Sequence, residues 1–246
     1  GKLLKHSPRP LGHGTQGIVG NMNGQPGFLG HQTINAANQG TAPRHHDAAI
    51  NKIGGEWSDL ILDAPASDAE VRRVEKAIGR DLPGDLRRFA LEVSRRVYFA
   101  WRLPENFSLP AKFREIFSGG IDFDLAALSS HEEGRAGWVR ECFPDPSNEY
   151  DAVWHDKFAF HHVMNGDYIA LDSSGVVVYL SHDGGEGNGV VMASSFSDLL
   201  QKWLPLGCPG PEDWQWLPFV DGPSSGLLPS GAAALKWRKL LGVART

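Results

Sequence analysis

The sequence predicts an α+β fold in which an antiparallel β-meander packs against helices on its N-terminal and C-terminal sides. Helix-capping patterns occur near residues 67 and 129, four short β-rich runs follow between residues 157 and 193, and a further capped helix begins at Ser195. Short glycine-containing turns separate the β-rich runs, and loops of this length join antiparallel strands. Helices, then a meander, then helices are typical of an α+β domain.

Two helices are expected before the meander. Ser67 and Glu70 form the S-x-x-E pattern of a capping box, and apolar residues follow at helical spacing until Gly79 ends the helix. A second helix is expected from Pro83, because proline is favoured at the first helical position. Its apolar stripe is formed by Leu86, Phe89, Ala90, Val93 and Val97. A solvated helix face explains the four basic residues that lie largely off this stripe, Arg87, Arg88, Arg95 and Arg96.

The remaining elements follow in order along the chain. A third helix is expected to start at Ser129 or Ser130 and to run toward Cys142. The β-rich runs cover residues 157–163, 168–172, 176–182 and 190–193. The helix capped by Ser195 is amphipathic and should pack on the sheet, and a final helix is expected over about residues 231–241.

Composition places the chain among ordinary globular proteins. Hydrophobic residues make up 41% of it and aromatic residues 10%, which is enough apolar surface for a core without disulfides or a structural metal. Cys142 and Cys208 form no C-x-x-C pair, so a reducing, cytoplasmic location is expected. No run approaches the roughly 18 consecutive apolar residues that a membrane span requires, and the N-terminus lacks a secretory pattern.

Charge and composition both change near residue 56. Residues 1–55 contain five Lys or Arg and one Asp or Glu, whereas residues 56–246 contain 19 and 28, a balance of −9. The first segment is also rich in Gly, Asn, Gln and His and has no sustained helical or strand period. We therefore expect residues 1–55 to be poorly ordered and residues 56–246 to form the folded domain.

Four segments together resemble a known family. The first, Glu75–Phe89, combines a glutamate, a hydrophobic–glycine pair, Leu-Pro and a helix that contains a phenylalanine. Three segments follow it in the expected order: Asn165–Asp172, Val177–Asp183 and Ser195–Leu200. In this combination the chain resembles the SUKH superfamily of Smi/Knr-type cell-wall regulators and bacterial toxin-immunity proteins.

The resemblance covers about residues 67–205, and residues 206–246 look like a C-terminal extension. Family members often carry Asn-Gly after the Leu-Pro helix, whereas this chain has Ser94–Val97 there, so a longer connection to the first strand is expected. The resemblance implies a SUKH-like, non-enzymatic, protein-binding domain without a cofactor. Its leading role is then an immunity protein that neutralises a bacterial toxin, for example a nuclease, and the alternative is a regulatory or scaffolding module that binds a host protein.

The acidic charge is concentrated on the meander and the segment that leads into it. Residues 122–198 contain 14 Asp or Glu and three Lys or Arg, which disfavours nucleic-acid binding and favours a basic protein partner. The candidate partner-binding residues are Asp122, Asp124, Asp167, Asp172, His182, Asp183 and Glu186. The competing interpretation applies to those that flank turns, where aspartate commonly binds local backbone amides.

The sequence supports an enzymatic function less well than it supports a binding function. Residues 222–226 match the G-x-S-x-G pattern, but they lie in a Pro/Gly/Ser loop rather than between a strand and a helix. The glycines of residues 184–189 are not followed by the Lys-Ser/Thr of a phosphate-binding loop. A metal-dependent hydrolase would have to use the histidines at 155, 161, 162 and 182, yet the adjacent His161 and His162 point to opposite faces of a strand. We predict no catalytic, cofactor-binding or metal-binding residue.

Overall fold

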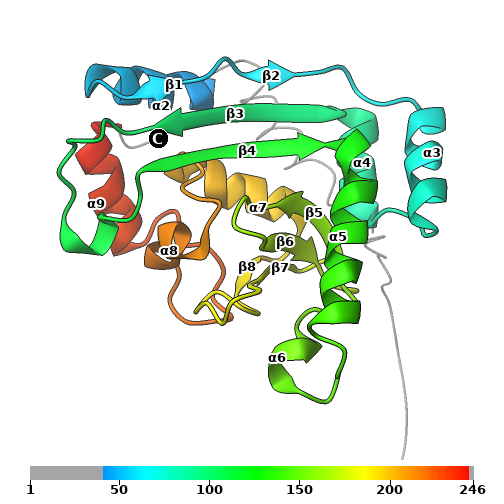
Figure 1. Ribbon diagram of the computed structural model, residues 1–246. Coiled ribbons are helices and arrows are strands. Elements are labelled where there is room, and N and C mark those ends of the chain that lie inside the picture. Colours follow the sequence, from blue (N-terminus) through cyan, green and yellow to red (C-terminus); the bar gives the residue numbers. More distant parts are fainter. Residues whose placement is uncertain (1–40, 244–246) are drawn as a thin grey trace, which may run out of the picture.

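The computed structural model describes residues 41–243, so predictions for residues 1–40 lie outside the described part of the chain. In chain order, the first half contains α2 (Thr41–Lys52), β1 (Glu56–Trp57), β2 (Ile61–Leu62), α3 (Asp68–Ile78), α4 (Gly84–Glu92), β3 (Arg96–Arg102), β4 (Ser118–Asp124) and α5 (Leu128–Glu141). The second half contains α6 (Glu149–Ala152), β5 (Phe158–His162), β6 (Tyr168–Leu171), β7 (Val177–Leu180), β8 (Val191–Ala193), α7 (Phe196–Trp203), α8 (Asp213–Trp216) and α9 (Ala232–Leu241). The fold is α+β, as predicted (Figure 1).

Two antiparallel sheets form the centre of the molecule. In the first sheet, β3 and β4 pair along their full length, and the short strands β1 and β2 pair with the other edge of β3. The second sheet has the order β5-β6-β7-β8 and is the meander that the sequence predicts. Figure 1 shows β3 and β4 crossing above the meander, with α5 running along one side toward α6. The β-rich runs expected from the sequence lie between residues 157 and 193 and do not include the strands of this first sheet.

The first helix has the predicted capping. The Ser67 hydroxyl accepts a hydrogen bond from the Glu70 amide, and the Glu70 carboxylate accepts one from the Ser67 amide at 2.8 Å. Gly79 then ends the helix with a left-handed φ of 79°, a conformation that glycine adopts without a steric penalty. The capping box therefore fixes both the start and the direction of α3.

The second helix ends earlier than the apolar stripe predicts. α4 stops at Glu92, and Val97 lies in β3, so the predicted helical role of Val97 is wrong. The reason is Ser94, which is fully buried and donates its hydroxyl to the backbone carbonyls of Asp63 and Arg96 at 2.7 and 2.6 Å. These hydrogen bonds turn the chain directly into β3. The longer connection expected here is also wrong, because only residues 93–95 join the two elements.

The main core is centred on a group of phenylalanine rings. Phe196, at the start of α7, is fully buried and its ring centroid lies 5.0 Å from Phe89 in α4 and 5.2 Å from Phe160 in β5. Phe123 of β4 lies 5.5 Å away. The rings meet edge to face or tilted, the arrangements that aromatic pairs prefer. One side chain thus contacts a helix and both sheets.

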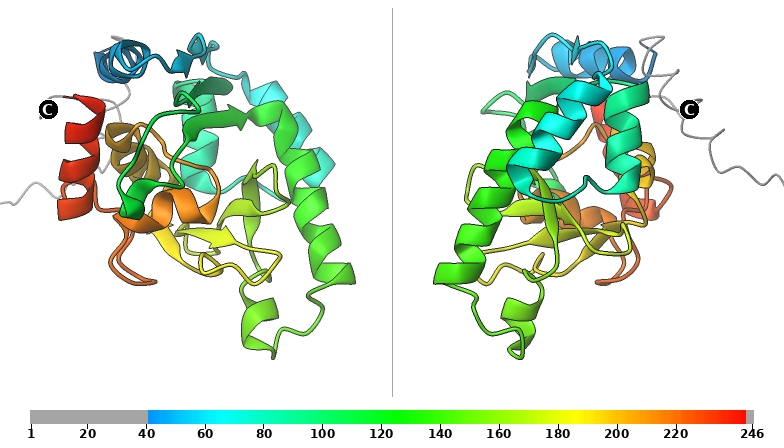
Figure 2. Two further views of the ribbon diagram at one scale, coloured as in Figure 1. Left: turned by 60° about the vertical axis from the view of Figure 1, so that its left-hand side comes forward. Right: turned by 90° about the vertical axis from the view of Figure 1, so that its right-hand side faces the viewer.

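The expectation of poor order in residues 1–55 is wrong for the part that the structure describes. Residues 41–52 form α2, and Ile50 is only 1% exposed and belongs to the main core. Figure 2 shows α2 close to α9 at one end of the molecule. The C-terminal extension is integrated in the same way, because Trp237 of α9 is fully buried and donates its indole N–H to the Leu206 carbonyl at 2.9 Å. None of the helices in residues 41–243 has the length and apolar character that crossing a bilayer requires.

Replacing Phe196 with alanine should reduce the free energy of unfolding by about 3–5 kcal/mol, because the deletion leaves a cavity where four elements meet. Phe89→Ala should have an effect of the same size. The matched control is Phe117→Ala, since the Phe117 side chain is 48% exposed and its loss should change stability little. Urea denaturation followed by circular dichroism measures all three. A Phe196→Ala chain with the parent's midpoint would contradict this description of the core.

A chain that starts at residue 56 should unfold at lower urea concentration than one that starts at residue 41. The shorter chain lacks Ile50, whose buried side chain should be worth about 2–5 kcal/mol, the usual cost of emptying such a position. Comparing the two denaturation curves checks this. Coincident curves would show that α2 contributes nothing to the stability of the core.

Candidate functional site

The predicted partner-binding residues do not form one cluster. Asp122 and Asp124 lie on the outer face of β4, where they alternate with buried residues. Asp167 and Asp172 flank the opposite ends of β6, so Asp172 lies apart from the other candidates on the meander. The side chains of Asp167 and His182 are in direct contact at 2.7 Å, and Asp183 and Glu186 follow in the β7–β8 connection.

Asp167 is a structural residue, which corrects its place among the partner-binding candidates. It is 1% exposed. One carboxylate oxygen accepts hydrogen bonds from the backbone and ring N–H of His182 at 2.8 and 2.7 Å. The other accepts from Tyr179 Oη at 2.7 Å and Asn165 Nδ2 at 2.8 Å. Burial and the Asp167 charge raise the pKa of the Tyr179 phenol, which therefore remains a donor at physiological pH.

Asp172 is also a structural residue, because its carboxylate stabilises the turn that follows it. Its Oδ1 atom accepts hydrogen bonds from the Ser174 hydroxyl at 2.7 Å and from the amides of Ser174 and Val176 at 2.8 and 2.9 Å. Partial burial opposes ionisation, but these donors more than offset it and hold the pKa of Asp172 below its usual value. The local-turn interpretation considered for the sequence thus describes Asp172 and Asp167. Asp124 has a comparable role, since its carboxylate accepts the Ala126 amide at 2.9 Å.

A group of acidic residues lies at the end of the molecule that contains α6. The Tyr150 hydroxyl donates to the Ser181 carbonyl at 2.5 Å and accepts the Gly184 amide at 2.8 Å, which fastens α6 to the β7–β8 connection. We call residues 141–155 and 181–189 together the acidic end. They contain no Lys or Arg and six acidic residues: Glu141, Asp145, Glu149, Asp151, Asp183 and Glu186. Asp183 and Glu186 are therefore joined here by acids that the sequence prediction did not single out.

The histidines considered for a metal site are dispersed. His155 contacts the Phe143 carbonyl, and His161 contacts the Asp122 carbonyl. Within residues 41–243, ligand atoms come within 4.8 Å of one another in a single group, Asp167, His182 and Asp183. Both oxygens of Asp167 and the Nδ1 atom of His182 are already engaged in hydrogen bonds, so the arrangement of these two side chains is explained by the contacts that hold His182 in place.

The short motifs that match enzyme signatures have no matching structure around them. Residues 222–226 lie in consecutive turns that no helix follows directly, so Ser224 is not held in the strained turn between a strand and a helix that a nucleophile requires. The glycines of residues 184–189 connect β7 to β8, and the Gly187 amide donates to Asp213 at 2.8 Å. Neither motif forms a catalytic arrangement.

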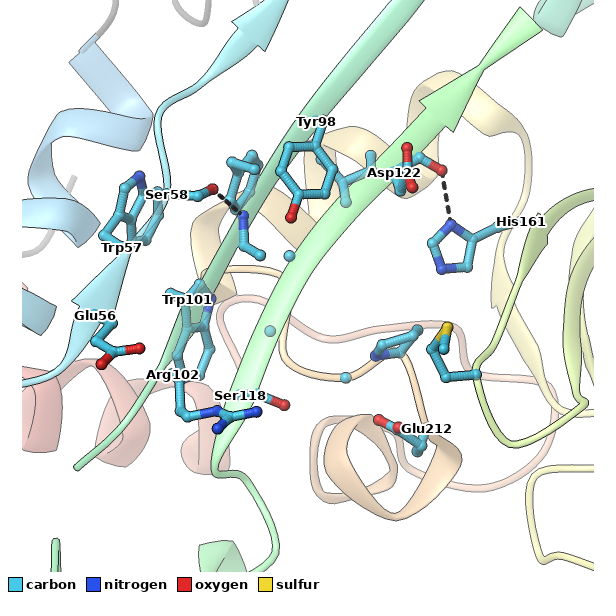
Figure 3. A pocket seen from close by; sticks show the side chains of 18 of the residues that line it. Glu56, Trp57, Ser58, Tyr98, Trp101, Arg102, Ser118, Asp122, His161 and Glu212 are labelled. Carbon is cyan, nitrogen blue, oxygen red and sulfur yellow. Dashed lines mark hydrogen bonds between the residues drawn. The ribbon is translucent and has the colours of Figure 1, made fainter. Parts of the chain in front are cut away.

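A groove of 790 Å³ lies over the outer face of the first sheet (Figure 3). Tyr98 and Asp122 are partners in the β3–β4 register, and Ala100 pairs with Gly120 beside them, so small residues form the floor. The walls come from distant parts of the chain. They include Trp57, His161, His162, Met164, Pro211 and Glu212. Met164 is 87% exposed at the turn between β5 and β6, which makes it a large apolar side chain at the rim.

His161 closes the seam between the two sheets. Its Nδ1 atom lies 2.9 Å from the Asp122 carbonyl oxygen, which can only accept, so Nδ1 must carry the hydrogen. Burial lowers the pKa of His161 to about 4, and the nearby rings of His131 and His162 act in the same direction. The ring is therefore neutral at physiological pH, and Nε2 is an acceptor. Figure 3 shows this second nitrogen on the groove side of the ring.

Lowering the pH should destabilise the folded protein through protonation of His161. Its pKa of about 4 in the folded state lies below the value of about 6.5 expected in the unfolded chain, so the unfolded chain binds more protons between these values. The associated stability is present above pH 6.5 and is lost as the pH falls toward 4, a change on the order of 3 kcal/mol. His161→Asn, which retains a donor for Asp122, should show a smaller difference in urea midpoint between pH 7.5 and 4.5. His155→Asn is the control, and equal slopes for His161→Asn and the parent would contradict the assignment.

The order of elements agrees with a family comparison. The model of the SMI1 / KNR4 family (SUKH-1) matches residues 65–202, from the segment before α3 to the end of α7. A search of curated proteins found no match to the chain. The family match spans more than half of the sequence and contains α4, both long strands of the first sheet and the whole meander. The chain therefore belongs to the SMI1 / KNR4 family (SUKH-1).

Proposed function

We propose that this chain is a non-enzymatic binding domain that neutralises a basic toxin domain, such as a nuclease, in the cytoplasm. The observation that carries the proposal is the acidic end, where six carboxylates and no Lys or Arg occupy two segments that are fastened together. Family membership supports it, because SUKH proteins include toxin-immunity proteins. The regulatory or scaffolding alternative has no observation of its own in its favour.

Charge gives the interaction a physical basis. A nuclease holds phosphates with clustered cations, and an acidic surface that covers those cations blocks the substrate. Complementary charge also accelerates encounter, because long-range attraction raises the association rate constant well above that of a neutral pair. The same charge disfavours direct binding of nucleic acid by this chain.

The acidic end is also preorganised. Asn148 caps α6 by accepting the Tyr150 amide at 2.8 Å, and the Asp145 amide donates to Asp151 at 3.1 Å. The Asn188 side chain then binds both the Ser181 amide at 3.1 Å and the Tyr150 carbonyl at 3.4 Å. A surface fixed in this way loses little conformational entropy on binding, so more of the interaction energy appears as affinity.

Reversing charge at the acidic end should slow association with the toxin domain. We expect Glu149→Lys, Asp183→Lys and Glu186→Lys, combined, to lower the association rate constant by roughly 10- to 1,000-fold while the dissociation rate changes less. Asp167 is not changed, because it is buried and its replacement would disturb the fold as well as remove a charge. The measurement is stopped-flow mixing, at low and physiological salt, with a basic toxin domain chosen from the reading frames that neighbour the gene.

The matched control reverses three exposed acids elsewhere, Asp59, Asp81 and Glu105, and thus changes net charge by the same amount. Thermal melts establish that both triple variants remain folded. Association that slows equally in both variants would show a net-charge effect rather than a binding surface. Association that is unchanged by the acidic-end variant would contradict the proposal.

A further inference from the structure

The groove over β3 and β4 presents acceptors near its centre. Figure 3 shows Asp122 and Glu212 apart from each other along the groove, and the second ring nitrogen of His161 lies between them. The positive charge in the lining belongs to Arg102, which pairs in register with Glu56 at the far end of the groove. The part of the groove bounded by Tyr98, Asp122 and Glu212 therefore carries negative charge without a matching cation from the lining residues.

One of these acceptors is unsatisfied within the described residues. The Oε2 atom of Glu212 is shielded from solvent and has no hydrogen-bond partner there. The Asp122 residue is exposed, and desolvation and the neighbouring Asp124 raise the pKa of its carboxyl group although the charge of Arg96 acts in the opposite direction. Polar groups removed from water are normally paired, so an oxygen in this state indicates a site where a donor is missing.

We propose that this groove binds an arginine side chain presented by a protein partner. The inference rests on the proposed function only in taking the partner to be a basic protein. A guanidinium is planar and has five N–H donors, so it can donate to the Asp122 carboxylate and the His161 nitrogen beside it while Glu212 adds negative charge farther along the groove. Its flat face can lie on the Tyr98 ring, and its methylene stem can contact Met164 at the rim.

Arginine fits better than lysine for geometric reasons. An ammonium is a compact point charge and lacks the planar fork with which a guanidinium donates to two neighbouring acceptors at once. Ala100 and Gly120 leave the floor free of projecting side chains, which suits a flat group. Guanidinium is also more weakly hydrated than ammonium, so it loses less on entering a partly buried site.

The groove is connected to the acidic end. Glu212 precedes Asp213, whose carboxylate accepts the Gly187 amide of the acidic end at 2.8 Å. On the other side of the rim, the turn that contains Met164 leads into Asp167, whose carboxylate contacts the His182 ring nitrogen at 2.7 Å. A single partner surface can therefore cover the acidic end and insert one arginine into the groove.

The test uses N-acetyl-arginine methylamide as the probe and the full chain labelled with ¹⁵N. We expect saturable chemical-shift changes at the floor amides, including Gly119 and Gly120. N-acetyl-citrulline methylamide has almost the same shape without the charge and should bind at least about tenfold more weakly, since a hydrogen bond to a charged group is worth that much. N-acetyl-lysine methylamide should also bind more weakly than the arginine probe.

Asp122→Asn and Glu212→Gln should each weaken binding of the arginine probe by about tenfold, and Tyr98→Leu should weaken it with both carboxylates in place. Glu133→Gln removes an exposed acid outside the groove and should leave affinity unchanged. Equal binding of the citrulline or lysine probe, or full affinity in Asp122→Asn and Glu212→Gln, would overturn the inference. These results are independent of the toxin-association experiment, in which the groove is intact, so failure of one proposal is distinguishable from failure of the other.

Discussion

The packing of Phe196 between the two sheets is the contact on which the remaining structure depends. Its ring meets Phe89 from α4, Phe123 from the first sheet and Phe160 from the second. The surrounding polar contacts take their geometry from this arrangement. Asp85 at the start of α4 accepts the Ser197 amide at 2.7 Å, and His161 can reach the Asp122 carbonyl because β5 is held against β4. The groove also results from this placement of the two sheets, since residues of both sheets line it.

The edges of the long strands are covered, which directs function to faces and loops. Glu132 of α5 accepts the Ala159 amide of β5 at 3.0 Å, and the residues around Pro223 pair with β8. Residues 208–210 pair with the edge of β4, where the Gly120 amide donates to the Cys208 carbonyl at 2.8 Å. Strand addition by a partner needs an open edge, and the open ones, β1 and β2, are two residues long. Side chains on turns and on the outer sheet face are what a partner can contact.

Motifs of neighbouring residues predict the helices and turns of this chain, but the sequence does not reveal contacts between residues that are distant along the chain. The capping box at Ser67 and the meander follow from neighbouring residues, whereas Val97 continues a helical stripe by coincidence and only the buried Ser94 shows why the helix ends. Asp167 and Asp172 look alike in sequence, but Asp167 is buried against Tyr179 of β7 and against His182, which follows that strand. The groove joins residues more than a hundred positions apart, so no spacing rule could assemble it. The signal available for β3 was the β-branched and aromatic content of residues 96–102.

The carboxylates of this chain divide into those that hold the fold and those that are available to a partner. Asp167, Asp172 and Asp85 each accept hydrogen bonds that fix a turn or a helix contact, so their replacement would leave donors unpaired. At the acidic end, neutral groups such as Tyr150 perform much of that fastening. Glu149 and Glu186 are exposed there and can change without unpairing the backbone beneath them. Under the proposed function, exposed acids such as Glu149 and Glu186 can therefore vary with a partner while Asp167, Asp172 and the phenylalanine core stay constant.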